Sequence, residues 1–245
     1  MNNEDELLEP LGNGIKIYTS KLHKFSTDTL LLADFVKPSK YEKAADFGTG
    51  CGAIPLFWAT KVPPKFTLAI EIQESAFNLA KKSIDLNKLS DKIKAVKGDI
   101  KDYALKSEEK HSFDLVVCNP PYKSIGSGLQ NKDDIKKLAR HEIECSIDDV
   151  AKAASNFLKN GGRLCLCQRP ERLVEVMSSM RKFKIEPKRL RFVQARKNKS
   201  PKLFMIEGKY GRNPGLTVMP TLILEESDGA RSEELKKIYM FYGEN

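Results

Sequence analysis

The chain has 245 residues, enough for one large α/β domain with at most a small appendage. Its composition, 40% hydrophobic and 31% charged, is typical of a soluble globular protein. The formal net charge of +9 is compatible with a polyanionic partner, although charge alone is weak evidence for one.

Several classes of protein are excluded by what the sequence lacks. No apolar run reaches the roughly 18–20 residues that a membrane span needs. The acidic N-terminus has neither the basic nor the apolar region of a signal peptide. The five cysteines form no CxxC pair and have no metal-ligand spacing with the three histidines. We therefore expect a cytoplasmic protein with reduced thiols, no membrane segment and no metal site.

The first 38 residues predict a hairpin followed by a short helix. Glu6–Tyr18 alternates loosely around a turn at Gly12–Gly14. Ser26–Asp28 can then cap a helix rich in leucine that runs to Phe35. Capping alone would explain Thr27 and Asp28, and a contribution to a binding site is the alternative.

Lys43–Phe47 predicts a short strand that leads into a turn with three glycines. Glycines at Gly48, Gly50 and Gly52 would let the backbone approach a ligand closely, with a helix N-terminus beyond. Gly48, Gly50 and Ala53 also match the dinucleotide pattern G-x-G-x-x-G/A. Asp46, at the mouth of this turn, instead favours a ligand that carries an ammonium group.

The next two predicted strands each end at an acidic residue. Lys65–Ile70 ends at Glu71, whose carboxylate is placed to accept both ribose hydroxyls of a nucleoside. A helix with apolar residues at helical spacing follows, from Ala76 to Leu86. Ile93–Val96 leads to Asp99, which could meet an adenine amine or simply cap the loop.

A fourth strand, Leu115–Cys118, is apolar throughout, as in a strand buried on both faces of a parallel sheet. It is followed by Asn119-Pro120-Pro121-Tyr122, where the prolines end the strand because neither can donate to a ladder. The Asn119 side-chain oxygen and the Pro120 carbonyl could accept both N–H bonds of a planar amine, with the Tyr122 ring stacked on its plane. An ordinary turn that ends a strand is the alternative.

The second half of the chain continues the alternation of helices and strands. Lys123–Ala139 is polar and predicts a mobile loop. Ser146–Leu158 predicts a helix that Asn160–Gly162 ends. The remaining predicted elements are a strand at Arg163–Cys167, a helix at Leu173–Met180, strands at Lys188–Ala195, Leu203–Glu207 and Leu216–Leu224, and a helix at Leu235–Met240.

One region is strongly basic. Residues 181–202 contain ten lysines and arginines against one acid, Glu186. Arg196–Lys202 within it looks like a loop between two closing strands. A solvated loop and a surface that contacts phosphates are both compatible with this charge.

The order of these elements resembles the class I S-adenosylmethionine-dependent methyltransferases. The glycine turn, Glu71, Gly98-Asp99 and Asn119–Tyr122 are each weak signals, but four in this order at credible spacing are strong. Asn-Pro-Pro-Tyr is shared by enzymes that methylate N6 of adenine in DNA or RNA, N2 of guanine in RNA, or a glutamine amide in release factors.

More of the chain resembles the bacterial tRNA1(Val) adenine-N6 methyltransferase family, on Phe25–Asp28, 46–122, Arg140–Glu142 and Asp228–Gly229. The resemblance implies an α/β, Rossmann-like fold: a mostly parallel seven-stranded sheet with helices on both faces and an antiparallel closing strand. It also implies a hairpin and cap helix at 1–38, packed on a methyltransferase domain at 39–245.

The resemblance further implies S-adenosylmethionine as cofactor, tRNA as partner and a monomer, with the adenosine 3′ of the anticodon in a valine tRNA as target. The cofactor residues carried over are Thr27, Asp46, Gly48, Gly50, Gly52, Glu71, Ile72, Asp99, Ile100 and Asn119. The catalytic residues are Asn119, Pro120, Pro121 and Tyr122. RNA contacts are expected at Tyr122, Arg140, His141, Arg196, Lys197 and Lys199.

Five alternatives are weighed against this interpretation. Release-factor methyltransferases usually carry a helical domain before the glycine turn, and only 45 residues precede Asp46. DNA adenine methylation is disfavoured because no separate target-recognition domain is evident, whereas rRNA methylation remains open. A basic RNA-binding protein that keeps the fold without activity is opposed by the intact Asp46, Glu71 and Asn119–Tyr122. Asp46 and the Asn119–Tyr122 turn also oppose a nicotinamide dehydrogenase.

Overall fold

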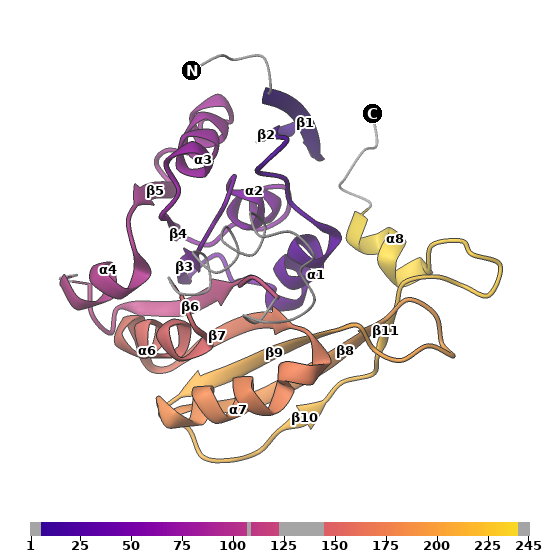
Figure 1. The fold of residues 1–245 in the computed structure, drawn as a ribbon. Helices are drawn as coiled ribbons and strands as arrows, with labels where there is room; N and C mark the ends of the chain where they lie inside the picture. Colours follow the sequence, from indigo (N-terminus) through magenta and orange to yellow (C-terminus); the bar gives the residue numbers. More distant parts are fainter. Residues whose placement is uncertain (1–5, 107–108, 123–144, 240–245) are drawn as a thin grey trace, which may run out of the picture.

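The computed structural model describes residues 6–106, 109–122 and 145–239. Within these ranges nine strands form one sheet, in the order β10-β8-β9-β7-β6-β3-β4-β5, with β11 also paired to β8 (Figure 1). The seven longer strands are β3 (Lys43–Phe47), β4 (Phe66–Glu71), β5 (Ile93–Lys97), β6 (Phe113–Cys118), β7 (Leu158–Gln168), β8 (Ile185–Gln194) and β9 (Leu203–Tyr210). β9 runs antiparallel to both β7 and β8, so the predicted mostly parallel sheet with an antiparallel closing strand is confirmed.

The predicted strand at Leu216–Leu224 is wrong in one respect. Two pieces of only two residues, β10 (Thr217–Val218) and β11 (Leu222–Ile223), each pair in parallel with β8 at the sheet edge. Pro220 separates them, because proline has no N–H to donate to a ladder and its ring restricts the preceding residue. The sheet formed by the described residues therefore has nine strands: the seven longer strands β3 to β9, which is the number that the resemblance implied, and the short strands β10 and β11.

Helices cover both faces of the sheet (Figure 1). One hydrophobic cluster joins the sheet to α1 (Thr27–Val36), α2 (Ala53–Ala59), α3 (Glu74–Leu86) and α8 (Glu233–Tyr239). A second cluster, on the opposite face, joins it to α4 (Ile100–Lys106), α6 (Ile147–Phe157) and α7 (Leu173–Lys182). Since both faces are covered, the Leu115–Cys118 part of β6 is buried throughout, as its apolar run predicted.

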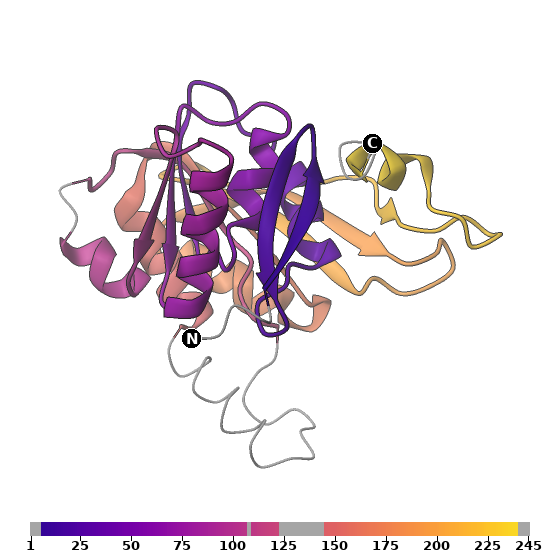
Figure 2. The ribbon, with the colours of Figure 1, turned by 90° about the horizontal axis from the view of Figure 1, so that it is seen from above.

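The predicted N-terminal hairpin is present as β1 (Glu6–Gly12) and β2 (Ile15–Ser20), and it lies along α2 and α3 (Figure 2). Asn13 Nδ2 donates to the Thr60 carbonyl at 2.6 Å, and Tyr18 N donates to Ser83 Oγ at 2.8 Å. Its buried Leu11 and Ile17 belong to the same cluster as the core of the sheet. The hairpin therefore shares a core with the sheet, while the domain boundary near residue 38 stays a prediction.

Side-chain caps set the starts of two helices. The Ser26 and Ser146 side chains accept from the backbone N–H of the third residue of α1 and α6, and the sequence had predicted the cap at Ser26. The helix predicted at Ser146–Leu158 is confirmed to within one residue at each end, but the next strand, predicted from Arg163, already begins at Leu158, before Asn160–Gly162. Leu158 pairs with Phe113 and is fully buried, so burial of an apolar side chain starts the strand before the glycines are reached.

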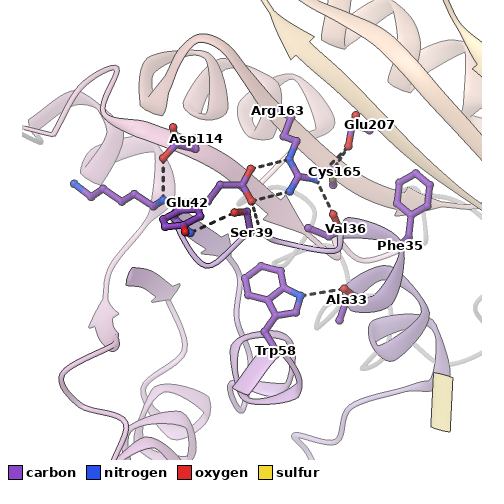
Figure 3. A network of polar contacts seen from close by, with 12 residues as sticks. Ala33, Phe35, Val36, Ser39, Glu42, Trp58, Asp114, Arg163, Cys165 and Glu207 are labelled. Carbon is purple, nitrogen blue, oxygen red and sulfur yellow. Dashed lines mark hydrogen bonds and ion pairs between the residues drawn. The ribbon is translucent and has the colours of Figure 1, made fainter. Parts of the chain in front are cut away.

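A network of charged side chains lies at the amino end of the parallel strands (Figure 3). The Arg163 guanidinium lies 3.0 Å from Glu42 Oε2 and 3.2 Å from Glu207 Oε2, and it donates to the Val36 carbonyl at 2.7 Å. Arg189 lies 2.7 Å from the same Glu207 oxygen. Burial opposes the ionisation of Glu207, yet the two arginines hold its pKa below the ordinary value. The network ties the end of α1 to β7, β8 and β9.

The five cysteines all fall within the described ranges, and their thiols are free. Throughout these ranges, every helix is too short or too polar to cross a membrane. In the same ranges no three His, Cys, Asp or Glu side chains are grouped so that they could hold a metal ion.

Candidate active site

A cavity of about 410 Å³ opens at the carboxyl ends of β3, β4, β5 and β6. The chain order reverses at β3, since β4 and β5 extend the sheet to one side and β6 and β7 to the other. Open α/β sheets bind ligands at such a reversal. Among the described residues, the predicted site residues that line the cavity are Gly48, Glu71, Ile72, Asp99, Ile100, Asn119, Pro120 and Pro121.

The glycine turn leaves free space beside its backbone. Gly48 and Gly50 have φ of +67° and +58°, and a Cβ at either would meet no atom within 4 Å. Gly52 differs, because a Cβ there would lie 3.3 Å from Ala80 Cβ on α3. Gly48 and Gly50 therefore suit close approach by a ligand, whereas Gly52 lets α2 pack against α3.

Asp46 lies beneath this turn and is 1% exposed. Thr49 Oγ1 donates to Asp46 Oδ2 at 2.6 Å, but Asp46 Oδ1 is buried without a hydrogen-bond partner. Burial raises the pKa of Asp46 to about 7, the Thr49 hydroxyl opposes that rise, and the charge of Glu71 adds to it. An unpartnered buried carboxylate oxygen is costly, and a bound cation beside it would relieve that cost.

Glu71 closes the turn from the neighbouring strand. Its Oε2 accepts from Gly50 N at 2.8 Å, and its Oε1 accepts from Gln73 N at 2.9 Å. Each carboxylate oxygen keeps a second lone pair, so both can still accept a hydroxyl. The carboxylates of Asp46 and Glu71 are hydrogen-bond acceptors. Together with the free space at Gly48, they fit a ligand with an ammonium group and a sugar diol, as S-adenosylmethionine has.

Asp99 starts a helix that the sequence analysis missed. Its Oδ1 accepts from Lys101 N at 2.8 Å, and its carbonyl accepts from Tyr103 N at 2.9 Å at the start of α4. The capping alternative is therefore confirmed, although Asp99 also lines the cavity. An N-cap residue followed by Ile100, Tyr103 and Ala104 at helical spacing was the signal, but seven residues give little periodicity.

The Asn119–Tyr122 turn lies against α1. Asn119 Nδ2 donates to Thr29 Oγ1 at 2.9 Å. Asn119 Oδ1 accepts from the Tyr122 hydroxyl at 3.0 Å and from the Cys167 thiol at 3.1 Å. Burial raises the pKa of both Tyr122 and Cys167, the latter to about 12, so both groups remain protonated donors at neutral pH.

The end of β7 completes the surroundings of this turn. Gln168 Nε2 donates to the Pro121 carbonyl at 3.2 Å, and the Arg169 guanidinium lies 4.7 Å from the centre of the Tyr122 ring. Cys167, Gln168 and Arg169 were not among the predicted site residues. Their only sequence signal was that they lie at the end of the strand predicted at Arg163–Cys167 or directly after it.

The other predicted residues are spread more widely. Thr27 is the first residue of α1, and its hydroxyl accepts from Tyr239 of α8 at 3.1 Å, outside the cavity lining. Arg196 lies in the connection between β8 and β9, which also contains Lys197 and Lys199. Its guanidinium is 2.9 Å from the Glu225 carboxylate. β9 is antiparallel to both β7 and β8, so β8 runs in the same direction as the parallel strands. This basic loop, which follows β8, therefore lies at the same end of the sheet as Asn119.

Arg140 and His141, and the loop predicted to be mobile at Lys123–Ala139, lie outside the described residues. No structural evidence therefore bears on their roles, which stay predictions.

Comparisons with known proteins agree on one family. A family model for the methyltransferase small domain matches residues 21–183, from just before α1 to just after α7. The chain is 31% identical over 199 residues to the tRNA1(Val) (adenine(37)-N6)-methyltransferase of Porphyromonas gingivalis, which covers 79% of this chain and 76% of that protein. It is 27% identical over 220 residues to the protein of the same name from Bacteroides thetaiotaomicron, covering 89% and 90%.

Solved structures share the fold. A predicted O-methyltransferase from Agrobacterium tumefaciens superposes with a TM-score of 0.71 at 19% identity, covering 89% of this chain and 98% of that one. The T. thermophilus 16S rRNA N2 G1207 methyltransferase, solved with AdoMet and guanosine, gives a TM-score of 0.59 at 16% identity, covering 84% and 50%. At such identities the likeness establishes the Rossmann-like fold alone.

Proposed function

The chain belongs to the methyltransferase small domain family and, within it, to the tRNA1(Val) (adenine(37)-N6)-methyltransferases, and from this membership we propose that it methylates N6 of an adenosine in tRNA. S-adenosylmethionine is the cofactor of this enzyme. By similarity we propose that the target is the adenosine 3′ of the anticodon in a valine tRNA and that the protein acts in the cytoplasm. The observation that carries the proposal is the Asn119–Tyr122 turn at the edge of the cavity.

The cofactor supplies an electrophilic methyl group, and the turn supplies acceptors for the amine. The lone pair of an aromatic amine is delocalised into the ring, so the amine is a weak nucleophile until that lone pair is localised. Asn119 Oδ1 and the Pro120 carbonyl would accept the two N–H bonds and draw the nitrogen toward tetrahedral geometry. The amine loses its proton only after attack, so no strong base is needed beforehand.

The incoming base must leave its stack, which costs least in a single-stranded loop. The Tyr122 ring would replace the lost stacking, worth roughly 1–3 kcal/mol per base. In the structure its hydroxyl bonds Asn119 Oδ1, where the amine would bind. Binding of the amine therefore requires this bond to yield, while the ring stays beside the base.

Arg196, Lys197 and Lys199 are proposed to contact RNA phosphates. They lie at the same end of the sheet as the Asn119–Tyr122 turn, and the paired Glu225 neutralises only part of their charge. Phosphate contacts of this kind position RNA without reading its sequence, so they would contribute affinity that falls with added salt.

Replacing Glu71 with alanine is expected to weaken S-adenosylmethionine binding about tenfold, because hydroxyl bonds to a carboxylate are lost. Isothermal titration would measure the dissociation constant. Glu71→Gln, which keeps one carbonyl oxygen, should fall between wild type and Glu71→Ala. Glu74→Ala is the matched control, since Glu74 is an exposed acid paired with Lys97. Equal affinity in Glu71→Ala and Glu74→Ala would contradict the role of Glu71.

The pKa of Asp46 near 7 predicts a pH dependence of cofactor binding. Only the ionised carboxylate attracts an ammonium group, and the ionised fraction of Asp46 rises as pH increases through 7. Affinity for S-adenosylmethionine should therefore increase about tenfold from pH 6 to pH 8. In Asp46→Asn this dependence should vanish. A wild-type dissociation constant that does not change over this range would contradict the proposed contact between Asp46 and the ammonium group.

Because the folded pKa of Asp46 exceeds its ordinary value of 3.8, the protein without cofactor should lose stability as pH rises from about 4 to 7. Melting temperatures with and without cofactor would separate this effect from binding. The cofactor should raise the melting temperature most above pH 7.

The proposed function is tested by methyl transfer from labelled S-adenosylmethionine. Three acceptors are offered separately: total tRNA from cells that lack the protein, duplex DNA, and a release factor. We expect label only in tRNA, recovered as N6-methyladenosine after nuclease digestion. Label in DNA or in protein alone would contradict tRNA as the substrate but would still support S-adenosylmethionine as the cofactor. Failure to bind S-adenosylmethionine would favour an RNA-binding protein without activity.

A further inference from the structure

Strand β7 ends against the turn proposed to bind the target amine. Cys167 bonds Asn119, Gln168 bonds the Pro121 carbonyl, and Arg169 covers one face of the Tyr122 ring. The last two residues of β7 and the residue directly after it therefore contact three of the four residues of the turn. Arg169 is the member of this group that carries charge and reaches solvent.

The backbone of Arg169 is held in place. Gln168 is fully buried, and its Oε1 accepts from Arg169 N at 2.9 Å while its Nε2 holds the Pro121 carbonyl. The Gln168 side-chain amide thus links the Pro121 carbonyl to the backbone N–H of Arg169. The backbone from which the Arg169 side chain extends toward Tyr122 is consequently fixed by buried structure.

The guanidinium itself has unused binding capacity. Arg169 Nη1 donates to the Lys202 carbonyl at 2.8 Å, where the basic loop returns to β9. An arginine carries five N–H donors in a planar fork, and this bond uses one of them. Arg169 therefore joins the Tyr122 ring to the basic loop and keeps further donors for an anion.

We propose that Arg169 is a substrate-binding residue that holds an RNA phosphate flanking the target adenosine. This inference rests on the proposed function. A base that leaves its stack brings its flanking phosphates to the rim of the site, and the guanidinium fork matches phosphate geometry. With Arg169 on one face of the Tyr122 ring, the base stacks on the other face.

A purely structural role for Arg169, as a latch between Tyr122 and the basic loop, makes a different prediction. A phosphate contact releases counterions, so its loss lowers the dependence of RNA affinity on salt. A latch can weaken activity but does not change this dependence. The salt dependence therefore distinguishes the two roles.

The test compares Arg169→Gln and Arg169→Lys with Arg181→Gln. Arg181 is the matched control because it is exposed and paired with Glu186 at the far end of α7. In Arg169→Gln we expect KM for a valine tRNA transcript to rise about tenfold or more. The slope of log affinity against log salt should fall in magnitude by about one. Arg169→Lys should keep the slope and recover part of KM, with the dissociation constant of S-adenosylmethionine unchanged in all three.

The outcomes separate this inference from the proposed function. If wild-type protein transfers no methyl group to tRNA and its RNA binding is insensitive to salt, both are overturned. If wild type is active but Arg169→Gln keeps the wild-type salt slope and KM, the inference alone fails. Loss of activity in Arg169→Gln with an unchanged salt slope would assign Arg169 the structural role.

Discussion

Replacing Asn119 with alanine is expected to lower kcat by about 10²- to 10³-fold, the range seen when one group that stabilises a transition state is removed. The Asn119 oxygen is one of two acceptors available to the target amine, and alanine leaves only the Pro120 carbonyl. Affinity for S-adenosylmethionine should change little by comparison, because the glycine turn and Glu71 remain in place. Single-turnover methylation and cofactor titration would measure the two quantities separately.

Two further variants test whether a loss of activity in Asn119→Ala could come from misfolding. Asn160→Ala is the matched control, since Asn160 is an exposed asparagine near the opposite end of β7. It should retain wild-type kcat. Thr29→Val removes the hydroxyl that accepts from Asn119 Nδ2 at 2.9 Å and should give an intermediate loss, because the amide is then less firmly oriented. Turnover of Asn119→Ala within a few fold of wild type would refute the mechanism.

Replacing Glu207 with alanine should destabilise the protein by about 3–5 kcal/mol, since removing one partner of a buried ion pair leaves the other charge uncompensated. Glu207 is 4% exposed, and its Oε2 lies 2.7 Å from Arg189 and 3.2 Å from Arg163, whose side chain is drawn beside Glu207 in Figure 3. Glu42 still compensates part of the Arg163 charge, so a loss near the lower end is expected. Urea unfolding followed by circular dichroism would give the free energy.

The matched control for this prediction is Glu234→Ala. Glu234 lies 2.8 Å from Arg191, but its side chain is 51% exposed, and exposed pairs contribute about 0–1 kcal/mol. A combined Arg163→Met and Glu207→Leu variant should recover part of the lost stability, because the buried Arg163 charge is removed together with its partner, while Glu42 and Arg189 each still lose one partner. A loss for Glu207→Ala no greater than for Glu234→Ala would show that the network contributes little.

Periodicity and local chemistry determined most of the fold. The apolar run at Leu115–Cys118 specified a buried strand, because a polar side chain on either face would lie against a helix. The cap at Ser26 marked a helix start, because its hydroxyl satisfies an otherwise unpaired N–H group. These signals act within a few residues, so they can be read without the tertiary structure.

The main parts of the candidate site were predictable for a related reason. Asp46, Glu71, Asp99 and Asn119 each end a predicted parallel strand or directly follow one, and parallel strands gather their carboxyl ends at one edge. The structure brings Glu71, Asp99 and Asn119 around one cavity, with Asp46 beneath its glycine turn. That part of the arrangement follows from strand order alone.

The rest was decided by tertiary structure. The end of α6 at Phe157 depends on the pairing of Leu158 with Phe113, a contact across 45 positions that no local pattern encodes. The unequal roles of Gly48 and Gly52 depend on whether α3 lies beside them. Arg169 reaches Tyr122 only because β7 pairs with β6, so its place beside the catalytic turn depends on the sheet and not on any motif.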